Sequence, residues 1–250
     1  TGAKYMSFAE GVEQGKIRFV GDDCKQALYE AIESRQVRPG LCKTAGLKLV
    51  YSPLNGSGLV PVTQVLKDIG ITDITIVPEQ EYPNGYFTTC SYPNPEIFAA
   101  LELGLNLAKE TGADLMLATD PDADRLGVYV KDAQTGEYHS LTGNMSGCLL
   151  EEYELSQRKA ANGSLPEDGA VVSTIVTTNM AGTIARSYGL RFIEVLTGFK
   201  YIGQQILGFE QSGKGTYLFG FEESYGCLIG THARDKDAIV ATMALCEAAA

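Results

Sequence analysis

The chain has 250 residues, of which 44% are hydrophobic and 20% charged, a balance that is ordinary for a globular protein. Its formal net charge of −11 repels nucleic acid and anionic membranes, and no stretch approaches the roughly 20 apolar residues of a membrane helix, so we expect neither as a partner. An anionic substrate would require cations that are gathered locally on this acidic chain.

The first half of the chain alternates between strand and helix patterns after an amphipathic N-terminal segment. A helix is predicted over 22–33, because apolar side chains recur there at helical spacing. The next predicted elements are a strand over 47–51, a helix that stops at Gly70, a strand over 74–77, a loop over 78–95, a helix that ends near Thr111, strands over 114–119 and 127–130, and a helix over about 144–160. We expect Asn94 to cap the helix that ends near Thr111, with Pro95 and Glu96 in its first turn.

A linker rich in Gly, Asn and Pro over 161–169 precedes a second unit. The predicted elements of this unit are a strand over 170–175, a helix over 179–188, a strand over 190–195, a helix over 199–209, strands over 216–221 and 226–231, and a last helix from Asp237 onward. The alternation continues that of the first half, so both units are of the same class.

These patterns predict an α/β protein with two consecutive α/β domains, each a mixed sheet covered by helices. The strand over 127–130 follows its neighbour without a helix between them, which indicates an antiparallel pair. We divide the chain into an N-terminal junction segment over 1–45, one α/β domain over 46–165 and a second over 166–250.

Six cysteines are scattered along the chain without a CxxC pair, which indicates reduced thiols and a cytoplasmic protein. The sequence opens at Thr1 rather than at Met, and it closes inside a helical pattern that no Gly or Pro ends. Both ends are typical of a piece taken from a longer protein.

An acidic loop follows the predicted strand over 114–119, in the sequence Thr119-Asp120-Pro121-Asp122-Ala123-Asp124-Arg125. Loops at the carboxyl ends of strands are where α/β proteins place ligands. The alternating aspartates can converge on one point, where their mutual repulsion requires a cation. Because carboxylate oxygens are hard ligands, they select Mg²⁺ or Ca²⁺, and Arg125 could hold a phosphate oxygen bidentately.

Other interpretations of this loop can be compared with the residues present. An EF-hand that starts at Asp120 would need Gly at its sixth position and Glu at its twelfth, where the chain has Arg125 and Lys131, so that interpretation fails. A phosphatase with Asp120 as nucleophile would usually carry Thr or Val in place of Asp124. It stays as an alternative, as does a plain solvated acidic turn.

Two loops of the second unit carry residues suited to a sugar. Gly220-Phe221-Glu222-Glu223-Ser224-Tyr225-Gly226 places carboxylates and a hydroxyl between glycines, a pattern that can bind sugar hydroxyl groups. Leu196-Thr197-Gly198-Phe199-Lys200 joins a strand to a helix, so its backbone N–H groups could meet an anion at the helix start. A capped turn and an ordinary glycine turn are the structural alternatives.

The segment 231–237 gathers His232, Arg234 and Lys236 within five positions, which supplies the local cations that an anionic substrate requires. Lys236 could exchange a proton if neighbouring cations lower its pKa. We expect His232 to be structural or solvated rather than catalytic, and a surface charge run is the alternative for the whole segment.

Four motifs in order resemble the α-D-phosphohexomutase family, the phosphoglucomutases and phosphomannomutases, over roughly residues 45–250. They are the acidic loop 119–125, Leu196-Thr197-Gly198-Phe199-Lys200-Tyr201-Ile202, the loop 220–226, and Arg234-Asp235-Lys236-Asp237. The resemblance implies reversible, Mg²⁺-dependent phosphoryl transfer between hexose 1-phosphate and hexose 6-phosphate, with glucose 1-phosphate, glucose 6-phosphate and glucose 1,6-bisphosphate as ligands.

The resemblance also implies roles for single residues. Asp120, Asp122 and Asp124 would hold Mg²⁺, and Arg125 would contact the phosphoryl group in transfer. The residues implied for the sugar or its phosphate are Thr197, Gly198, Lys200, Glu222, Ser224 and Arg234. Lys236 would meet substrate phosphate and act as an acid or base.

Members of the family have four domains, the first with a phosphoserine in a Ser-His-Asn-Pro-like motif. No such motif occurs in these 250 residues, which therefore resemble the second and third domains. We expect the chain to lack mutase activity by itself and to work with the remaining domains of the same protein. A complete sugar-phosphate binding module is the alternative, and the preferred sugar, glucose, mannose or a pentose, stays open.

Overall fold

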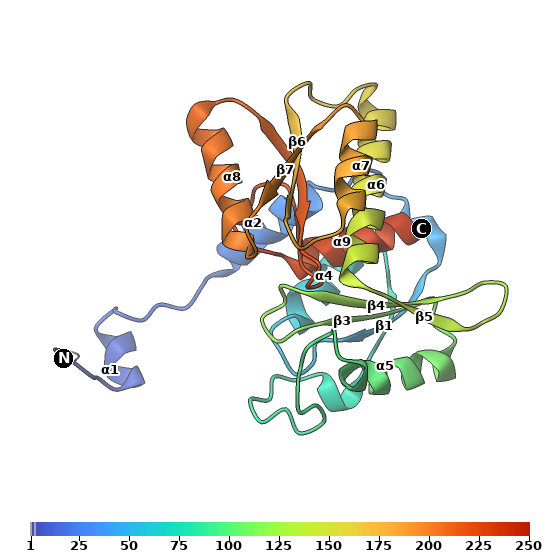
Figure 1. The fold of residues 1–250 in the computed structure, drawn as a ribbon. Helices are drawn as coiled ribbons and strands as arrows, with labels where there is room; N and C mark the ends of the chain where they lie inside the picture. Colours follow the sequence, from blue (N-terminus) through green and yellow to red (C-terminus); the bar gives the residue numbers. More distant parts are fainter. Residues whose placement is uncertain (1, 3) are drawn as a thin grey trace.

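The computed structural model describes residue 2 and residues 4–250, so residues 1 and 3 of the predicted junction segment lie outside the described part (Figure 1). It contains a five-stranded sheet in the order β2-β1-β3-β4-β5 and a four-stranded sheet in the order β7-β6-β8-β9. Helices cover both sheets, and each sheet mixes parallel and antiparallel pairs. The predicted class, two consecutive α/β domains with mixed sheets, is confirmed.

The elements of the first sheet and its helices follow the predicted alternation, apart from α1, α3, η1 and β5, which were not predicted. Their bounds are α1 Phe8–Glu13, α2 Asp22–Glu33, α3 Cys42–Ala45, β1 Lys48–Ser52, α4 Leu59–Asp68, β2 Asp73–Ile76, η1 Pro78–Gln80, α5 Phe98–Thr111, β3 Leu115–Thr119, β4 Leu126–Lys131 and β5 Tyr138–Leu141. β3 pairs antiparallel with β4, because only the acidic loop connects them, so the antiparallel prediction is confirmed.

The second sheet is preceded by the long helix α6. The bounds are α6 Gly143–Asn162, β6 Gly169–Thr174, α7 Asn179–Ser187, β7 Arg191–Val195, α8 Phe199–Ser212, β8 Thr216–Phe221, β9 Cys227–Ile229 and α9 Ala238–Ala249. Asp237 caps α9 by accepting hydrogen bonds from the backbone N–H groups of Ile239 and Val240, which is why the last helix starts there.

The prediction that Asn94 caps α5 is wrong. The helix begins at Phe98, its N-cap is Ile97, and no side chain caps it. The side chain of Asn94 instead accepts a hydrogen bond from the backbone N–H of Glu96, at 2.9 Å, and so closes a turn before the helix. Asn and Pro suit such a turn as well as a helix start, and sequence alone does not separate the two.

One apolar core runs between the two sheets, so the domains share their packing. It contains residues of both sheets, among them Leu49 and Leu117 of the first and Val171 and Phe219 of the second. α9 lies between the sheets in Figure 1 and packs against α4, α6, β9 and β4. A separate core lies under α5 on the outer face of the first sheet, and another under α8 on the outer face of the second. The strand ends that carry the predicted loops are thereby held rigidly.

The segment before α2 extends away from the body in Figure 1. Its apolar side chains are exposed, including Tyr5, Phe8 and Phe19. Among the described residues, no helix is long and apolar enough to cross a membrane.

Candidate functional site

The acidic loop converges as the sequence predicts. It connects β3 to β4, and Ala123 turns the chain with a φ of 57°. Carboxylate oxygens of Asp120, Asp122 and Asp124 all lie within 4.8 Å of one another. The three side chains therefore point to one place, as carboxylates that share a cation do.

Asp120 is the buried anchor of this group, at 7% exposure. Its Oδ1 accepts hydrogen bonds from the backbone N–H groups of Asp124, at 3.0 Å, and Arg125, at 2.9 Å. Burial raises the pKa of Asp120 to about 7; the Arg125 backbone N–H opposes this rise, and the charges of Asp124 and Asp122 add to it. The loop thus concentrates negative charge in a partly buried place.

The donor set fits a hard divalent cation. Three carboxylates within 4.8 Å repel one another unless a cation lies among them, and oxygen donors of this kind suit Mg²⁺. Asp122 is exposed, whereas Asp120 is buried, so the group opens to solvent on one side. A bound Mg²⁺ could be reached there by a phosphate oxygen.

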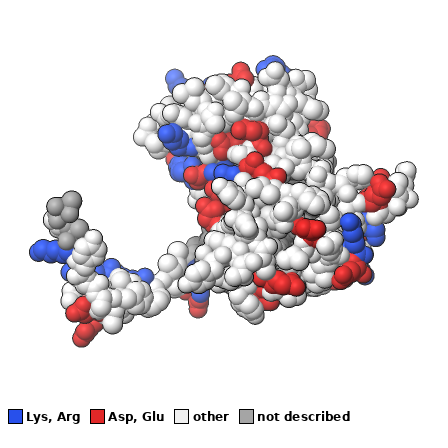
Figure 2. Space-filling view, turned by 60° about the horizontal axis from the view of Figure 1, so that its bottom comes forward, with Lys and Arg blue, Asp and Glu red and all other residues white. Residues whose placement is uncertain are grey.

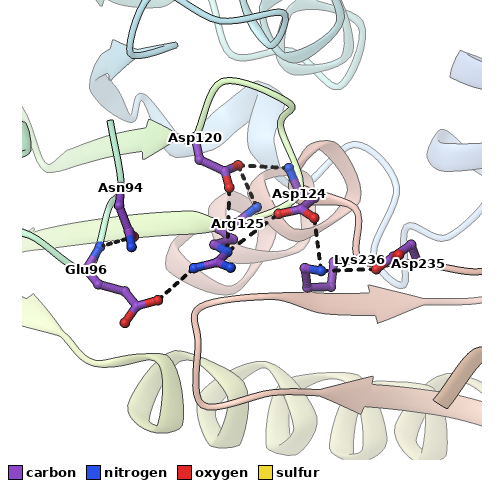
Figure 3. Close-up of polar contacts among 7 residues, drawn as sticks. All are labelled: Asn94, Glu96, Asp120, Asp124, Arg125, Asp235 and Lys236. Atoms are coloured by element: carbon purple, nitrogen blue, oxygen red, sulfur yellow. Dashed lines mark hydrogen bonds and ion pairs between the residues drawn. The ribbon is translucent and has the colours of Figure 1, made fainter. Parts of the chain in front are cut away.

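Arg125 lies between this group and Glu96 (Figure 3). Its Nη1 donates a hydrogen bond to Glu96 Oε1 at 2.8 Å. Its Nε lies 3.6 Å from Asp120 and 3.8 Å from Asp124, beyond hydrogen-bonding distance. The guanidinium is thus beside the metal-binding carboxylates but is held mainly by Glu96.

The sugar-type loop joins the antiparallel strands β8 and β9. Glu222 is 6% exposed, and its Oε1 accepts a hydrogen bond from the Gly198 backbone N–H at 3.0 Å. Burial raises the pKa of Glu222, while the charge of Lys236 and the Gly198 N–H act against the rise. The two loops that the sequence assigns to the sugar therefore meet at one hydrogen bond.

Glu223 fixes this loop from the other side. Its Oε2 accepts hydrogen bonds from the hydroxyls of Thr177, at 3.1 Å, and Thr174, at 3.4 Å, at the end of β6. Tyr225 turns the chain with a φ of 68°. A Cβ at Gly143 would lie 2.0 Å from the Glu223 carbonyl oxygen, so the start of α6 packs directly on the loop.

Lys236 connects the two domains at the site. Its Nζ lies 2.9 Å from Asp124 Oδ2 and 3.1 Å from Asp235 Oδ1, and its side chain is 12% exposed. A Cβ at Gly226 would lie 2.0 Å from Lys236 Cδ, so the lysine stem crosses the sugar-type loop to reach the acidic loop. The ammonium also lies 5.7 Å from the centre of the Phe199 ring.

The condition under which Lys236 would exchange a proton, a pKa lowered by neighbouring cations, is not met. Burial favours the neutral amine, but hydrogen bonds to Asp124 and Asp235 outweigh burial and raise the pKa. The groups around this ammonium are carboxylates, so Lys236 is a fixed positive charge here.

Backbone hydrogen bonds also connect the surroundings of the two loops. Leu126 N donates to the Tyr225 carbonyl at 2.9 Å, and Ala238 N donates to the Ala123 carbonyl at 2.9 Å. One backbone hydrogen bond thus joins the start of β4 to the sugar-type loop, and the other joins the acidic loop to the start of α9. The ion pair of Lys236 with Asp124 is a third contact between the two domains.

The other predicted residues differ in their exposure and in their partners. Thr197 and Lys200 are exposed, and Ser224 is half-buried. Arg234 points elsewhere, since its guanidinium pairs with Glu210 of α8. His232 is structural, as expected, because its Nε2 lies 2.7 Å from Asp237, the cap of α9.

Each potential cation of 231–237 thus has an acidic partner, so the predicted free positive patch is not present in the structure. On the face drawn in Figure 2, basic and acidic side chains likewise lie next to one another. The sequence did not predict the contact of Glu96 with Arg125 or those of Glu223 with Thr174 and Thr177, because these partners are remote in sequence. The only signal was the position of Glu96 beside Asn94 and Pro95, which we interpreted as a helix start.

Family profiles match both halves of the chain. The profile described as "Phosphoglucomutase/phosphomannomutase, alpha/beta/alpha domain II" matches residues 26–136, and that described as "Phosphoglucomutase/phosphomannomutase, alpha/beta/alpha domain III" matches residues 142–250.

Curated relatives cover almost the whole chain. It is 34% identical to a phosphoribomutase of Saccharomyces cerevisiae, over 96% of this chain and 40% of the relative. It is 37% identical to a probable phosphomannomutase of Haemophilus influenzae, over 86% and 43%. It is 34% identical to a phosphoglucomutase of Staphylococcus epidermidis, over 91% and 40%. The chain spans less than half the length of these relatives.

Solved structures share the fold at lower identity. A phosphoglucomutase/phosphomannomutase family protein of Burkholderia thailandensis superposes with a TM-score of 0.64 at 21% identity, over 88% of this chain and 42% of the other. N-acetylphosphoglucosamine mutase of Aspergillus fumigatus, in complex with GlcNAc-6P and magnesium, superposes with a TM-score of 0.55 at 18% identity, over 90% and 50%.

Proposed function

Because the chain belongs to the phosphoglucomutase/phosphomannomutase family, we propose that it is the metal- and sugar-binding part of a mutase that interconverts hexose 1-phosphate and hexose 6-phosphate. The single observation that carries this proposal is the 2.9 Å ion pair between Lys236 and Asp124, because the lysine stem passes Gly226 of the Glu222 loop to reach the acidic loop. A phosphoryl group on a bound sugar would lie between them. Our division at 45/46 and 165/166 stays part of the proposal.

Asp120, Asp122 and Asp124 would hold Mg²⁺. When bound, the ion would neutralise charge on a phosphoryl group. Asp120 fixes the loop through the backbone N–H groups of Asp124 and Arg125, so the ligands are arranged before a metal binds.

Arg125 and Lys236 would supply the remaining positive charge. Phosphoryl transfer depends mostly on positioning and on charge stabilisation, and fixed cations in a partly buried place serve both needs. Lys236 is held by Asp124 and Asp235, and its raised pKa keeps it charged. We assign both residues to binding and orienting phosphoryl oxygens.

Glu222 would accept hydrogen bonds from sugar hydroxyls through its remaining carboxylate lone pairs, with Ser224 beside it. Thr197, Gly198 and Lys200 would line the same place, because the Gly198 N–H is bound to Glu222. Arg234 would reach a substrate phosphate only after it leaves Glu210.

A pentose phosphate is the second candidate substrate. Two relatives, from Saccharomyces cerevisiae and Schizosaccharomyces pombe, are named phosphoribomutase and probable phosphoribomutase, at 34% and 39% identity. Ribose 1-phosphate and glucose 1-phosphate should therefore be compared directly. We also propose a cytoplasmic location, in line with six free cysteines.

The test measures Mg²⁺ and sugar binding separately from turnover. We expect calorimetry to show Mg²⁺ binding to the chain, weakened at least about tenfold in Asp122→Ala, since even outer-shell changes cost that much at metal sites. Asp73→Asn, an exposed carboxylate on β2, is the matched control and should bind like wild type. Unchanged affinity in Asp122→Ala would refute the metal assignment.

Sugar binding and turnover complete the test. Glucose 1,6-bisphosphate should bind in the presence of Mg²⁺ and should bind more weakly to Glu222→Gln. A coupled assay on the 250 residues alone should show no conversion of glucose 1-phosphate, because they contain no Ser-His-Asn-Pro motif. Conversion by these residues alone would refute the proposal that the phosphoserine lies in another domain of the protein.

A further inference from the structure

Glu96 is the one direct hydrogen-bond partner of the Arg125 side chain within residues 4–250. It comes from the turn before α5, and its Oε1 accepts from Arg125 Nη1 at 2.8 Å. About one third of each side chain is exposed, 37% for Glu96 and 32% for Arg125. Carboxylate–guanidinium hydrogen bonds of this length are stronger than neutral ones, so the contact can set where the guanidinium lies.

The position of Glu96 is fixed by the turn it occupies. Asn94 Oδ1 accepts from the Glu96 backbone N–H at 2.9 Å, and the Asn94 carbonyl accepts from Ile97 N at 3.0 Å. The same turn packs on the first sheet, because a Cβ at Gly127 would lie 2.7 Å from Pro95 Cβ. Glu96 is therefore presented to Arg125 by backbone, and Figure 3 shows it on the side of Arg125 away from the aspartates.

If Glu96 were absent, the carboxylates of Asp120 and Asp124 would be the nearest groups to attract the guanidinium of Arg125. Its Nε is 3.6 Å from Asp120 and 3.8 Å from Asp124, so both carboxylates attract it at a distance slightly longer than a hydrogen bond. Opposite charges at this distance attract appreciably even at a protein surface. Arg125 would then occupy oxygens that a metal ion needs.

We propose that Glu96 is a positioning residue that holds Arg125 off the metal-binding carboxylates. It thereby keeps Asp120 and Asp124 available to Mg²⁺. It also leaves Nη2 of Arg125, which makes no hydrogen bond within residues 4–250, for a phosphoryl oxygen. The inference deepens the proposed function and rests on it.

The test is a double-mutant cycle read out by Mg²⁺ calorimetry on the chain, without any need for turnover. Glu96→Gln should weaken Mg²⁺ binding about tenfold, the usual size of an outer-shell effect. In an Arg125→Met background, Glu96→Gln should alter the affinity for Mg²⁺ by less than about twofold, because only a surface charge away from the aspartates is then lost. A purely structural role of Glu96 would not depend on Arg125.

Glu102→Gln is the matched control, because Glu102 is an exposed carboxylate of α5 that forms no hydrogen bond or ion pair within the described residues. It should change Mg²⁺ affinity by less than about twofold. An equal loss in Glu102→Gln, or an equal loss in the Arg125→Met background, would overturn the inference. So would wild-type affinity in Glu96→Gln, while absence of Mg²⁺ binding by the wild-type chain would overturn the proposed function as well.

Discussion

The ammonium of Lys236 lies 2.9 Å from Asp124 Oδ2, so a residue just before the last helix holds the acidic loop of the first sheet. The lysine reaches this carboxylate by passing over Gly226, where no side chain stands in its way. One ion pair thus joins the acidic loop of the first domain to the segment before α9 of the second, so its removal should affect the stability of both domains.

Lys236→Met should lower the free energy of unfolding by about 1–2 kcal/mol, less than the loss of a fully buried pair, because 12% of the lysine and 24% of the aspartate are exposed. Mg²⁺ should bind more tightly, since Asp124 loses a competing cation. Urea unfolding and calorimetry measure the two effects. Lys214→Met, at an exposed lysine without an ion pair in the described structure, is the control; equal results for the two variants would contradict the prediction.

Gly226→Ala should disturb the same ion pair from the other loop. A Cβ at Gly226 would lie 2.0 Å from Lys236 Cδ, so either the lysine or the loop must shift, at a cost of about 1–3 kcal/mol in urea unfolding. Gly208→Ala in α8 meets nothing within 4 Å and should instead stabilise by about 0.5–1 kcal/mol. If the Gly226→Ala cost persists undiminished in a Lys236→Ala background, the contact with Lys236 is not its cause.

Glu247→Ala should destabilise the docking of the segment after α2. The carboxylate is 2% exposed and accepts from the backbone N–H groups of Val37, at 3.0 Å, and Arg38, at 2.9 Å, and from the Tyr153 hydroxyl, at 3.0 Å. Loss of this acceptor leaves donors unpaired, so we expect about 2–4 kcal/mol less stability. Hydrogen exchange should show faster exchange at Val37 and Arg38 first; protection equal to wild type there would contradict the prediction.

Stability should fall as pH rises because of Glu151. This side chain is fully buried on α6, and neither carboxylate oxygen has a hydrogen-bond partner among the described residues. Burial raises its pKa from 4.5 to about 8, and the charge of Glu152 adds to the rise. The folded state therefore binds the proton of Glu151 more tightly than the unfolded state does. Protonation stabilises the folded state fully below pH 4.5, and this stabilisation is lost as the pH rises to about 8.

Glu151→Met removes this titration while keeping the side-chain volume. We expect it to stabilise the chain by about 1–3 kcal/mol at pH 8, where wild type must bury a charge or retain a proton. Its advantage over wild type should be smaller at pH 5. Urea unfolding at both pH values measures this, and a difference between the two proteins that does not grow with pH would rule out Glu151 as the cause.

Sequence patterns located most elements to within a few residues. Periodicity and the glycine stop at Gly70 placed α4, and the short connection between β3 and β4 correctly indicated an antiparallel pair. The start of α5 was missed because Asn94 forms a turn with Glu96 and not a helix cap. The surroundings of Lys236 were missed because its partner Asp124 is remote in sequence.

The sequence by itself determined what depends on neighbours along the chain. Asp120, Asp122 and Asp124 lie within five positions, so one tight loop is enough to bring their carboxylates together. Tertiary structure alone decided which charged side chains contact that loop, and whether the pKa of Lys236 is raised or lowered. Glu96 reaches Arg125 because its turn packs on β4, and Lys236 reaches Asp124 because the sugar-type loop packs beside the acidic loop. Such contacts follow from the packing of both sheets on one core, and no local pattern encodes that packing.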